Sequence, residues 1–170
     1  LGHRRAAGLG GQTHLQVFGH REATKDLAAL GHITHAQTNP LVRFLSVDGA
    51  AIELDVDGRW PDATFDAVFT ANSLHIMGWP QVEAFFAGVG KVLQEDGLLI
   101  VYGPFNYGGD FTSDSNRAFE QWLKDRDPAS GIRDVEAVDA LAREIGLVLV
   151  EDNAMPANNR CLVWRRRKFL

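Results

Sequence analysis

The strongest pattern in this sequence is an apolar run that ends abruptly in polar side chains. Phe65 to Ala71 is rich in β-branched and aromatic residues, and Asn72, Ser73 and His75 follow it. A short apolar run of this kind predicts a buried parallel strand. Because ligands bind at the carboxyl ends of strands in open α/β sheets, the polar residues indicate a candidate site. The alternative is an ordinary central strand with its connecting loop.

The same order of strand, polar loop and helix continues downstream. A helix opening at Trp79-Pro80 and ending at Asp96-Gly97 has one apolar face at a period of about 3.6 residues. That face consists of Val82, Phe85, Phe86, Val89, Val92 and Leu93. Leu98 to Tyr102 then predicts a second buried strand, followed by a loop from Gly103 to Gly109 that supplies glycine, Asn, Tyr and Phe.

Two more helices and two more strands are predicted for the end of the chain. Ser113 to Ser115 offers capping oxygens to one helix, and Asp134 caps another that ends at Gly146. Leu147 to Glu151 and Arg160 to Trp164 predict strands. Their short connection permits an antiparallel hairpin and excludes a parallel crossover.

The part of the chain before residue 48 has a different character. It shows no sustained period of 2 or 3.6 residues and carries a formal charge of +3; since the whole chain carries −5, the remainder carries −8. A short helix over Glu22 to Leu30 is the element predicted there. His32 and His35 would share one helix face, but no carboxylate or cysteine stands at ligand spacing, so we expect no metal site. We predict an atypical segment over 1–47 and the carboxyl part of a single domain over 48–170.

One further strand is predicted just before the opening run. Ala50 to Val56 is a short alternating stretch that leads into Asp55, Asp57 and a turn at Gly58. Asp55 is therefore another polar group near the carboxyl end of a strand. A turn-capping aspartate is the common alternative.

Composition narrows the class of protein. At 170 residues with 45% apolar content, one domain with a single core is expected. A single cysteine, Cys161, excludes an intrachain disulfide and suits a cytoplasmic setting. No run approaches the roughly 20 apolar residues of a membrane span, so no membrane partner is expected. The charge of −5 makes nucleic acid an unfavoured partner.

The order of elements is that of the carboxyl half of a class I S-adenosylmethionine-dependent methyltransferase, with a Rossmann-like α/β sheet closed by a terminal antiparallel hairpin. From about Ile52 to Arg166 the chain more closely resembles the methyltransferase-like 26 family, whose substrate is unknown. Short matches in the right order carry this resemblance: Leu54-Asp55-Val56, Phe65-Asp66-Ala67-Val68-Phe69, Asn72-Ser73-Leu74-His75-Ile76, Tyr102-Gly103-Pro104-Phe105, Thr112-Ser113-Asp114-Ser115-Asn116, Arg126-Asp127-Pro128, Gly131-Ile132-Arg133-Asp134 and Met155-Pro156-Ala157-Asn158-Asn159.

The resemblance implies a cofactor and a set of site residues. Asp55 and Val56 would lie near the adenine of S-adenosylmethionine, and Asn72 and Ser73 would contact both cofactor and methyl acceptor. His75 is the only side chain in the matching region that titrates near neutrality, so it is the candidate catalytic base; a core histidine is the alternative. The acceptor side would be lined by Tyr102, Phe105, Asn106, Arg133, Asn158 and Asn159.

The family's amino-terminal cofactor loop has no counterpart in this sequence. Members open with a strand that ends in a Glu-x-Gly-x-Gly-x-Gly type loop, followed by an acidic residue after the second strand. Gly8 to His14 contains glycines, but no apolar strand precedes them. We therefore expect the first strands of the sheet to be degraded or missing. A shifted reading frame or a truncated start is one hypothesis for residues 1–47.

The predicted function is a methyltransferase acting on a small-molecule or otherwise unknown acceptor. The alternative from a different class is a cofactor-free, methyltransferase-like interaction module, or an inactive truncated or frame-shifted product. A third hypothesis is another doubly wound nucleotide-binding domain, against which the terminal hairpin argues. The oligomeric state stays open.

Overall fold

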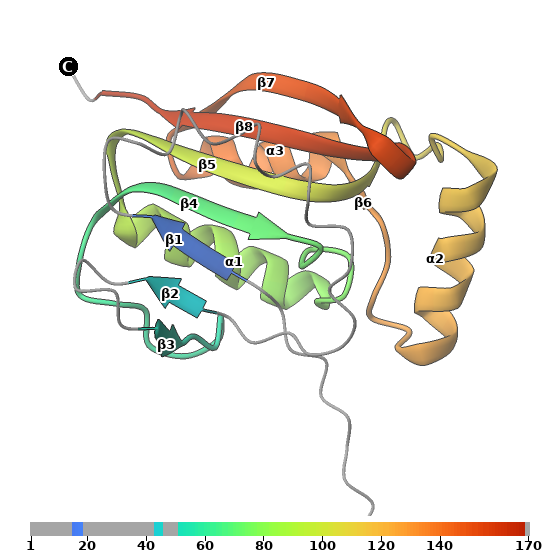
Figure 1. Ribbon diagram of the computed structural model, residues 1–170, viewed down its shortest axis with the longest axis horizontal. Coiled ribbons are helices and arrows are strands. Elements are labelled where there is room, and N and C mark those ends of the chain that lie inside the picture. Colours follow the sequence, from blue (N-terminus) through green and yellow to red (C-terminus); the bar gives the residue numbers. More distant parts are fainter. Residues whose placement is uncertain (1–14, 19–42, 46–50, 169–170) are drawn as a thin grey trace, which may run out of the picture.

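The structure is a computed structural model that describes residues 15–18, 43–45 and 51–168 (Figure 1). The glycine cluster at 8–14, the helix predicted over 22–30 and the histidine pair at 32 and 35 lie outside the described residues.

A six-stranded sheet forms the centre of the molecule. Its strands follow the order β1 (Leu15–Phe18), β4 (Phe65–Ala71), β5 (Leu93–Asn106), β8 (Asn159–Arg166) and β7 (Leu147–Met155), and β6 (Arg133–Asp134) pairs with the end of β5. β5 is parallel to β4, whereas β8 is antiparallel to both β5 and β7. The predicted central strand and the predicted terminal hairpin are therefore confirmed.

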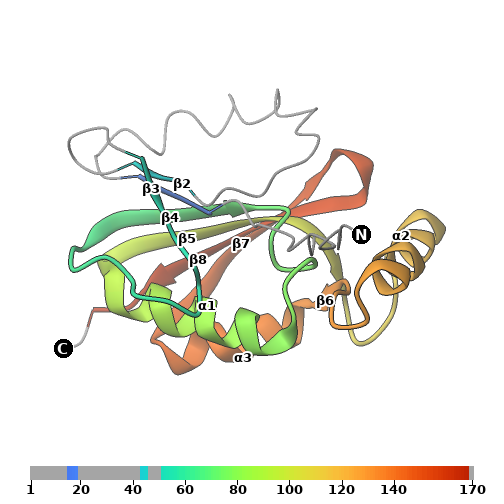
Figure 2. The same cartoon turned by 90° about the horizontal axis from the view of Figure 1, so that it is seen from below.

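Two of the three α-helices within the described residues cover one face of this sheet. α1 (Trp79–Val92) and α3 (Val135–Glu144) lie on the same side of it, and α2 (Asp114–Arg126) stands apart beyond β6 (Figure 2). The apolar face predicted for α1 is buried, and Phe86 meets the ring of Trp164 edge-on at 6.3 Å. The Trp164 indole donates to Asp139 of α3 at 2.9 Å. This contact joins α3 to the sheet inside the main core.

The segment between β3 (Ala51–Glu53) and β4 is fixed to α1 by Trp60. Its indole N–H donates to the carbonyl of Val56 at 3.1 Å, and its ring lies on Gly88. A Cβ at position 88 would lie 1.8 Å from the indole, so only glycine permits this contact.

β5 is longer than the strand predicted over 98–102. α1 ends at Val92 rather than at Asp96-Gly97, because Leu93 already pairs with Phe65, and the register shifts before Ala67 pairs with Leu98. At the other end, residues expected to form a loop continue the strand to Asn106, because β8 and β6 supply pairing partners there.

The amino-terminal strands depart from a parallel arrangement. β1 runs antiparallel to β4, with Leu15 opposite Thr70 and Phe18 opposite Ala67. β2 (Arg43–Leu45) and β3 (Ala51–Glu53) pair with each other in a separate two-stranded sheet. The strand predicted over 50–56 is thus shorter than expected, and Asp55 does not follow a strand of the main sheet.

Candidate functional site

A groove of about 480 Å³ opens at the carboxyl ends of β4 and β5. Its walls come from the loop after β4, from β5, from the start of α2 and from the turn between β7 and β8. The lining residues are Asn72, His75, Pro104, Ser115, Asn116, Phe119, Ala157, Asn158 and Asn159. This is the edge at which open α/β sheets bind ligands, and the volume lies in the range of small-molecule sites.

The loop after β4 presents Asn72 and His75 beside a glycine. The Asn72 backbone N–H donates to the Tyr102 carbonyl at 2.8 Å, which holds the loop against β5. A Cβ at Gly103 would lie 3.7 Å from His75 Nδ1 and 3.9 Å from Asn72 Oδ1. Gly103 is therefore packed against both polar side chains, within ordinary contact distance of a Cβ at that position.

His75 is an uncharged group at neutral pH. Its side chain is buried with a relative exposure of 6%, and Phe119 meets the ring edge-on at 5.4 Å. Burial, helped by the positive charge of Arg133, lowers the pKa of His75 to about 4. Neither imidazole nitrogen has a hydrogen-bonding partner within the described residues. A neutral imidazole can accept a proton from a ligand, although so low a pKa makes it a weak base.

Arg133 secures the loop instead of lining the groove. Its guanidinium donates to the carbonyl of Leu74 at 3.1 Å, to that of Ala129 at 3.0 Å and also to that of Met77. These bonds satisfy the carbonyls that follow β4. Arg133 therefore acts on the predicted acceptor side only indirectly, by holding the loop that carries His75.

The turn between β7 and β8 is tied to the start of α2. The Asn116 amide donates to Thr112 at 2.9 Å and to the Asn158 carbonyl at 3.2 Å. The Asn158 amide in turn donates to Ser115 at 3.0 Å. As predicted, a serine caps α2: Ser113 Oγ accepts from the Asn116 backbone N–H at 3.1 Å. The opposite wall of the groove is thus a hydrogen-bonded unit.

Backbone conformations with a positive φ gather at this groove. Among the described residues, four that are not glycine have a positive φ, and three of these line the groove. They are Asn72 at 55°, Ala157 at 58° and Asn158 at 58°. Asparagine tolerates this conformation, so the cost, of the order of 1 kcal/mol, falls mainly on Ala157.

The predicted site residues divide into three groups. Asn72, His75, Asn158 and Asn159 meet in the groove, and the Asn159 amide reaches the Tyr102 hydroxyl at 3.2 Å. Other predicted residues are buried beneath or beside it: Ser73, which is hydrogen-bonded to Thr70, Phe105 in the main core, and Asn106, whose Oδ1 has no partner within the described residues. Asp55 and Val56 do not line the groove.

Asp55 has the geometry of a turn-capping residue. Its side chain is exposed, and its Oδ1 accepts from the Asp57 backbone N–H at 3.0 Å. Asp57 in turn accepts from Gln81 of α1 at 3.1 Å. A cofactor role for Asp55 stays a prediction.

Besides Pro104 and Ala157, three groove residues were missing from the predicted site residues: Ser115, Asn116 and Phe119. Ser115, Asn116 and Phe119 belong to the first turns of α2. From the sequence, the two polar side chains were interpreted as helix caps and Phe119 as a core residue. The spacing of Asn116 and Phe119, three residues apart on one helix face, was the available signal.

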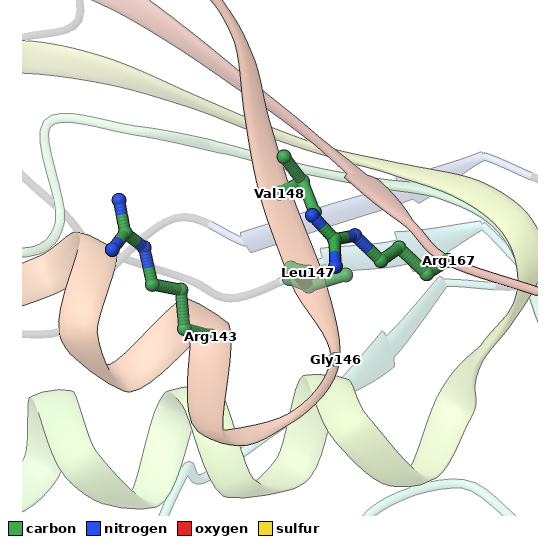
Figure 3. A pocket seen from close by; sticks show the side chains of 5 residues that line it. All are labelled: Arg143, Gly146, Leu147, Val148 and Arg167. Atoms are coloured by element: carbon green, nitrogen blue, oxygen red, sulfur yellow. The ribbon is translucent and has the colours of Figure 1, made fainter. Parts of the chain in front are cut away.

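A second cavity, of about 450 Å³, lies at the other end of the sheet (Figure 3). It is lined by Arg143, Gly146, Leu147, Val148 and Arg167. Its place is fixed by register, because Leu147 pairs with Arg166 near the amino end of the paired part of β5. Arg143 is already engaged with Asp139 at 2.6 Å. Its position away from the strand ends makes this cavity the weaker candidate.

Solved structures of methyltransferases share this fold. An O-methyltransferase family protein from Burkholderia thailandensis is 12% identical with a TM-score of 0.61, and the match covers 74% of this chain and 36% of that protein. The mitomycin 7-O-methyltransferase MmcR is 18% identical with a TM-score of 0.59, covering 68% and 33%. CalO1, a methyltransferase in calicheamicin biosynthesis solved in its SAH-bound form, is 15% identical with a TM-score of 0.56, covering 68% and 33%.

These matches establish a methyltransferase-like α/β fold. The chain spans about a third of the length of the solved proteins it matches. Within the described residues, no helix combines the length and the apolar character needed to cross a membrane.

The sequence also matches a defined family over most of its length. The family is described as "Protein of unknown function (DUF938)", and the match extends over residues 19–166. This chain belongs to the DUF938 family, with a methyltransferase-like fold.

Proposed function

We propose that this chain is an S-adenosylmethionine-dependent methyltransferase whose described residues form the acceptor side of the site. The fold of the matched solved structures and the resemblance of residues 52–166 to the methyltransferase-like 26 family both support this proposal. The acceptor itself is addressed separately below.

The observation that carries the proposal is the place and construction of the groove. Polar side chains from the loop after β4 meet the turn between β7 and β8 at the carboxyl edge of the sheet. Asn72, which has a positive φ at the end of β4, lines the same groove as the hairpin turn at Ala157 and Asn158. A binding site gains fixed positions for its contacts from such an arrangement.

The residues of the groove would orient the acceptor and hold its proton. The cofactor, when bound, supplies an activated methyl group. Asn72 would position the nucleophilic atom, and a nitrogen of His75 that has no partner within the described residues would accept a hydrogen bond from it. With its pKa near 4, His75 suits the orientation of a nucleophile better than full proton removal at neutral pH.

The described residues fit the cofactor on one side only. Asn72 and His75 line the groove at the transfer end, but β1 runs antiparallel where the class I order requires a parallel first strand. No described residue therefore supplies a loop after such a strand. We assign no residue of the described part to the methionine end of the cofactor.

Calorimetric titration with S-adenosylmethionine tests the proposal. A dissociation constant of the order of micromolar, weakened roughly tenfold in Asn72→Ala, would support it. Asn153→Ala is the matched control, because Asn153 is an exposed amide on β7 bonded to Glu151 and distant from the groove lining. Thermal unfolding establishes that each variant is folded.

The antiparallel pairing of β1 favours a second candidate, a methyltransferase-like interaction module without cofactor. Folded protein that shows no heat of binding with millimolar S-adenosylmethionine would support the module and refute the enzyme.

A further inference from the structure

The polarity and charge of the residues that line the groove limit which ligands it can bind. Among the described lining residues none carries a charge at neutral pH: the polar ones are four asparagines, at positions 72, 116, 158 and 159, together with Ser115 and the neutral His75. The apolar ones are Pro104, Phe119 and Ala157. A charged ligand would find no ion-pair partner among these residues.

Three charged side chains of the supporting elements are engaged elsewhere. Arg133 is bound to three backbone carbonyls of the supporting loops. Glu120 accepts from the Ile132 backbone N–H at 2.6 Å, and Arg160 pairs with Asp152 at 2.7 Å. None of these groups is free to recognise an ion in the groove.

The asparagines present oxygen atoms to a ligand. The amide nitrogens of Asn158 and Asn159 donate to Ser115 and Tyr102, so their nitrogen atoms are engaged. Within the described residues no donor reaches the Oδ1 atoms of Asn72, Asn158 or Asn159. A ligand with an N–H or O–H group would complete these hydrogen bonds.

Phe119 supplies a flat wall. Its ring is held edge-on by His75 at 5.4 Å and is stacked with Trp122 at 5.5 Å with an interplanar angle of 23°. Rings fixed in this way offer aromatic contact at little entropic cost. Pro104 provides a second rigid apolar surface on β5.

From these features we infer that the groove binds an uncharged, planar molecule that donates hydrogen bonds from an N–H or O–H group. The inference rests on the proposed function for its meaning, because such a donor atom is also a nucleophile for methyl transfer. Binding itself needs no cofactor, so the two ideas can fail separately.

Four small probes separate the features of this ligand. Benzamide has a flat ring, no charge and N–H donors; benzoate adds charge; N,N-dimethylbenzamide removes the donors; cyclohexanecarboxamide removes the flat ring. Titration followed by ¹H–¹⁵N spectra should show benzamide shifting the resonances of Asn72, Asn158 and Asn159. Each of the other three probes should bind at least about fivefold more weakly.

Variants place the probe in the groove. Phe119→Leu should weaken benzamide at least about fivefold, since it removes the ring and keeps the volume. Phe111→Leu is the matched control, because the Phe111 ring packs under Arg117 and does not line the groove. Equal affinity for benzamide and benzoate, shifts confined to other residues, or equal effects of the two variants would each overturn the inference. Benzamide binding without S-adenosylmethionine binding would sustain it and refute the enzyme alone.

Discussion

The groove and the second cavity described above have nearly the same volume, about 480 and 450 Å³, yet they differ in chemistry. The groove at the carboxyl ends of β4 and β5 is lined by amides and rings. The cavity at the start of β7 contains two arginines, Arg143 and Arg167. Cavity volume therefore does not separate a candidate site from an incidental hollow. The structural reason for each lining residue does separate them.

The difference follows from how strands and helices end. Basic residues favour the last turns of helices, and Arg143 occupies that position in α3. Its charge is explained by the helix and by Asp139. In the groove, the positive φ of Ala157 and Asn158 belongs to the tight turn between β7 and β8, which the bond from the Asn159 N–H to the Pro156 carbonyl closes. Asn72 is different, because its positive φ lies at the carboxyl end of β4, where open α/β sheets bind ligands.

Acidification should produce the largest effect. Burial holds the pKa of His75 near 4 in the folded protein, against about 6.5 in the unfolded chain. Between these values the unfolded state binds a proton that the folded state does not. Stability should therefore fall by about 3 kcal/mol as pH drops from 6.5 to 4. Urea unfolding of wild type and His75→Leu at several pH values measures this loss; parallel curves for the two proteins would contradict it.

Relief of the strained turn should have a smaller effect. Ala157→Gly removes a Cβ from a residue at φ 58°, so the protein should gain about 0.5 to 1 kcal/mol of stability. Ala154→Gly is the control, since Ala154 lies within β7, where glycine costs stability. Denaturant unfolding compares the two. A loss of stability in Ala157→Gly would show that the conformation is not a cost and would weaken the case for the groove.

Loss of an arginine from the second cavity should have the smallest effect. Arg143→Gln removes an ion pair to Asp139, but the arginine side chain is 74% exposed. Screening by solvent limits the destabilisation to about 0.5 kcal/mol or less, with further reduction at high salt. Benzamide affinity should stay unchanged. A weaker benzamide complex in Arg143→Gln would remove the functional distinction between the cavities.

Much of the fold could be predicted because the spacing of apolar residues along the chain reflects which positions are buried. The apolar face of α1, the strand over Phe65–Ala71 and the terminal hairpin each follow from local pattern and connection length. The length of β5 could not be predicted, because its last residues depend on pairing with β8 and β6. The antiparallel direction of β1 likewise depends on a partner far away in the sequence.

The candidate site was only partly predictable. Asn72 and His75 stand directly after a strand, so position alone identifies them. Phe119 and Asn116 reach the groove through the placement of α2, which depends on hydrogen bonds to the turn at Asn158. Arg133 appeared to be a binding residue, but its carbonyl contacts give it a supporting role. Tertiary contacts, not residue type, decide between these roles.

The central claim is that the groove at the carboxyl ends of β4 and β5 is the methyl-acceptor side of a methyltransferase site. Site-resolved ¹H–¹⁵N titration with S-adenosylmethionine tests it most directly. The account predicts saturable shifts at the backbone amides of Asn72 and Gly103, with those of Gly146 and Leu147 unmoved. Shifts confined to Gly146 and Leu147, or no shifts at millimolar ligand in folded protein, would contradict it.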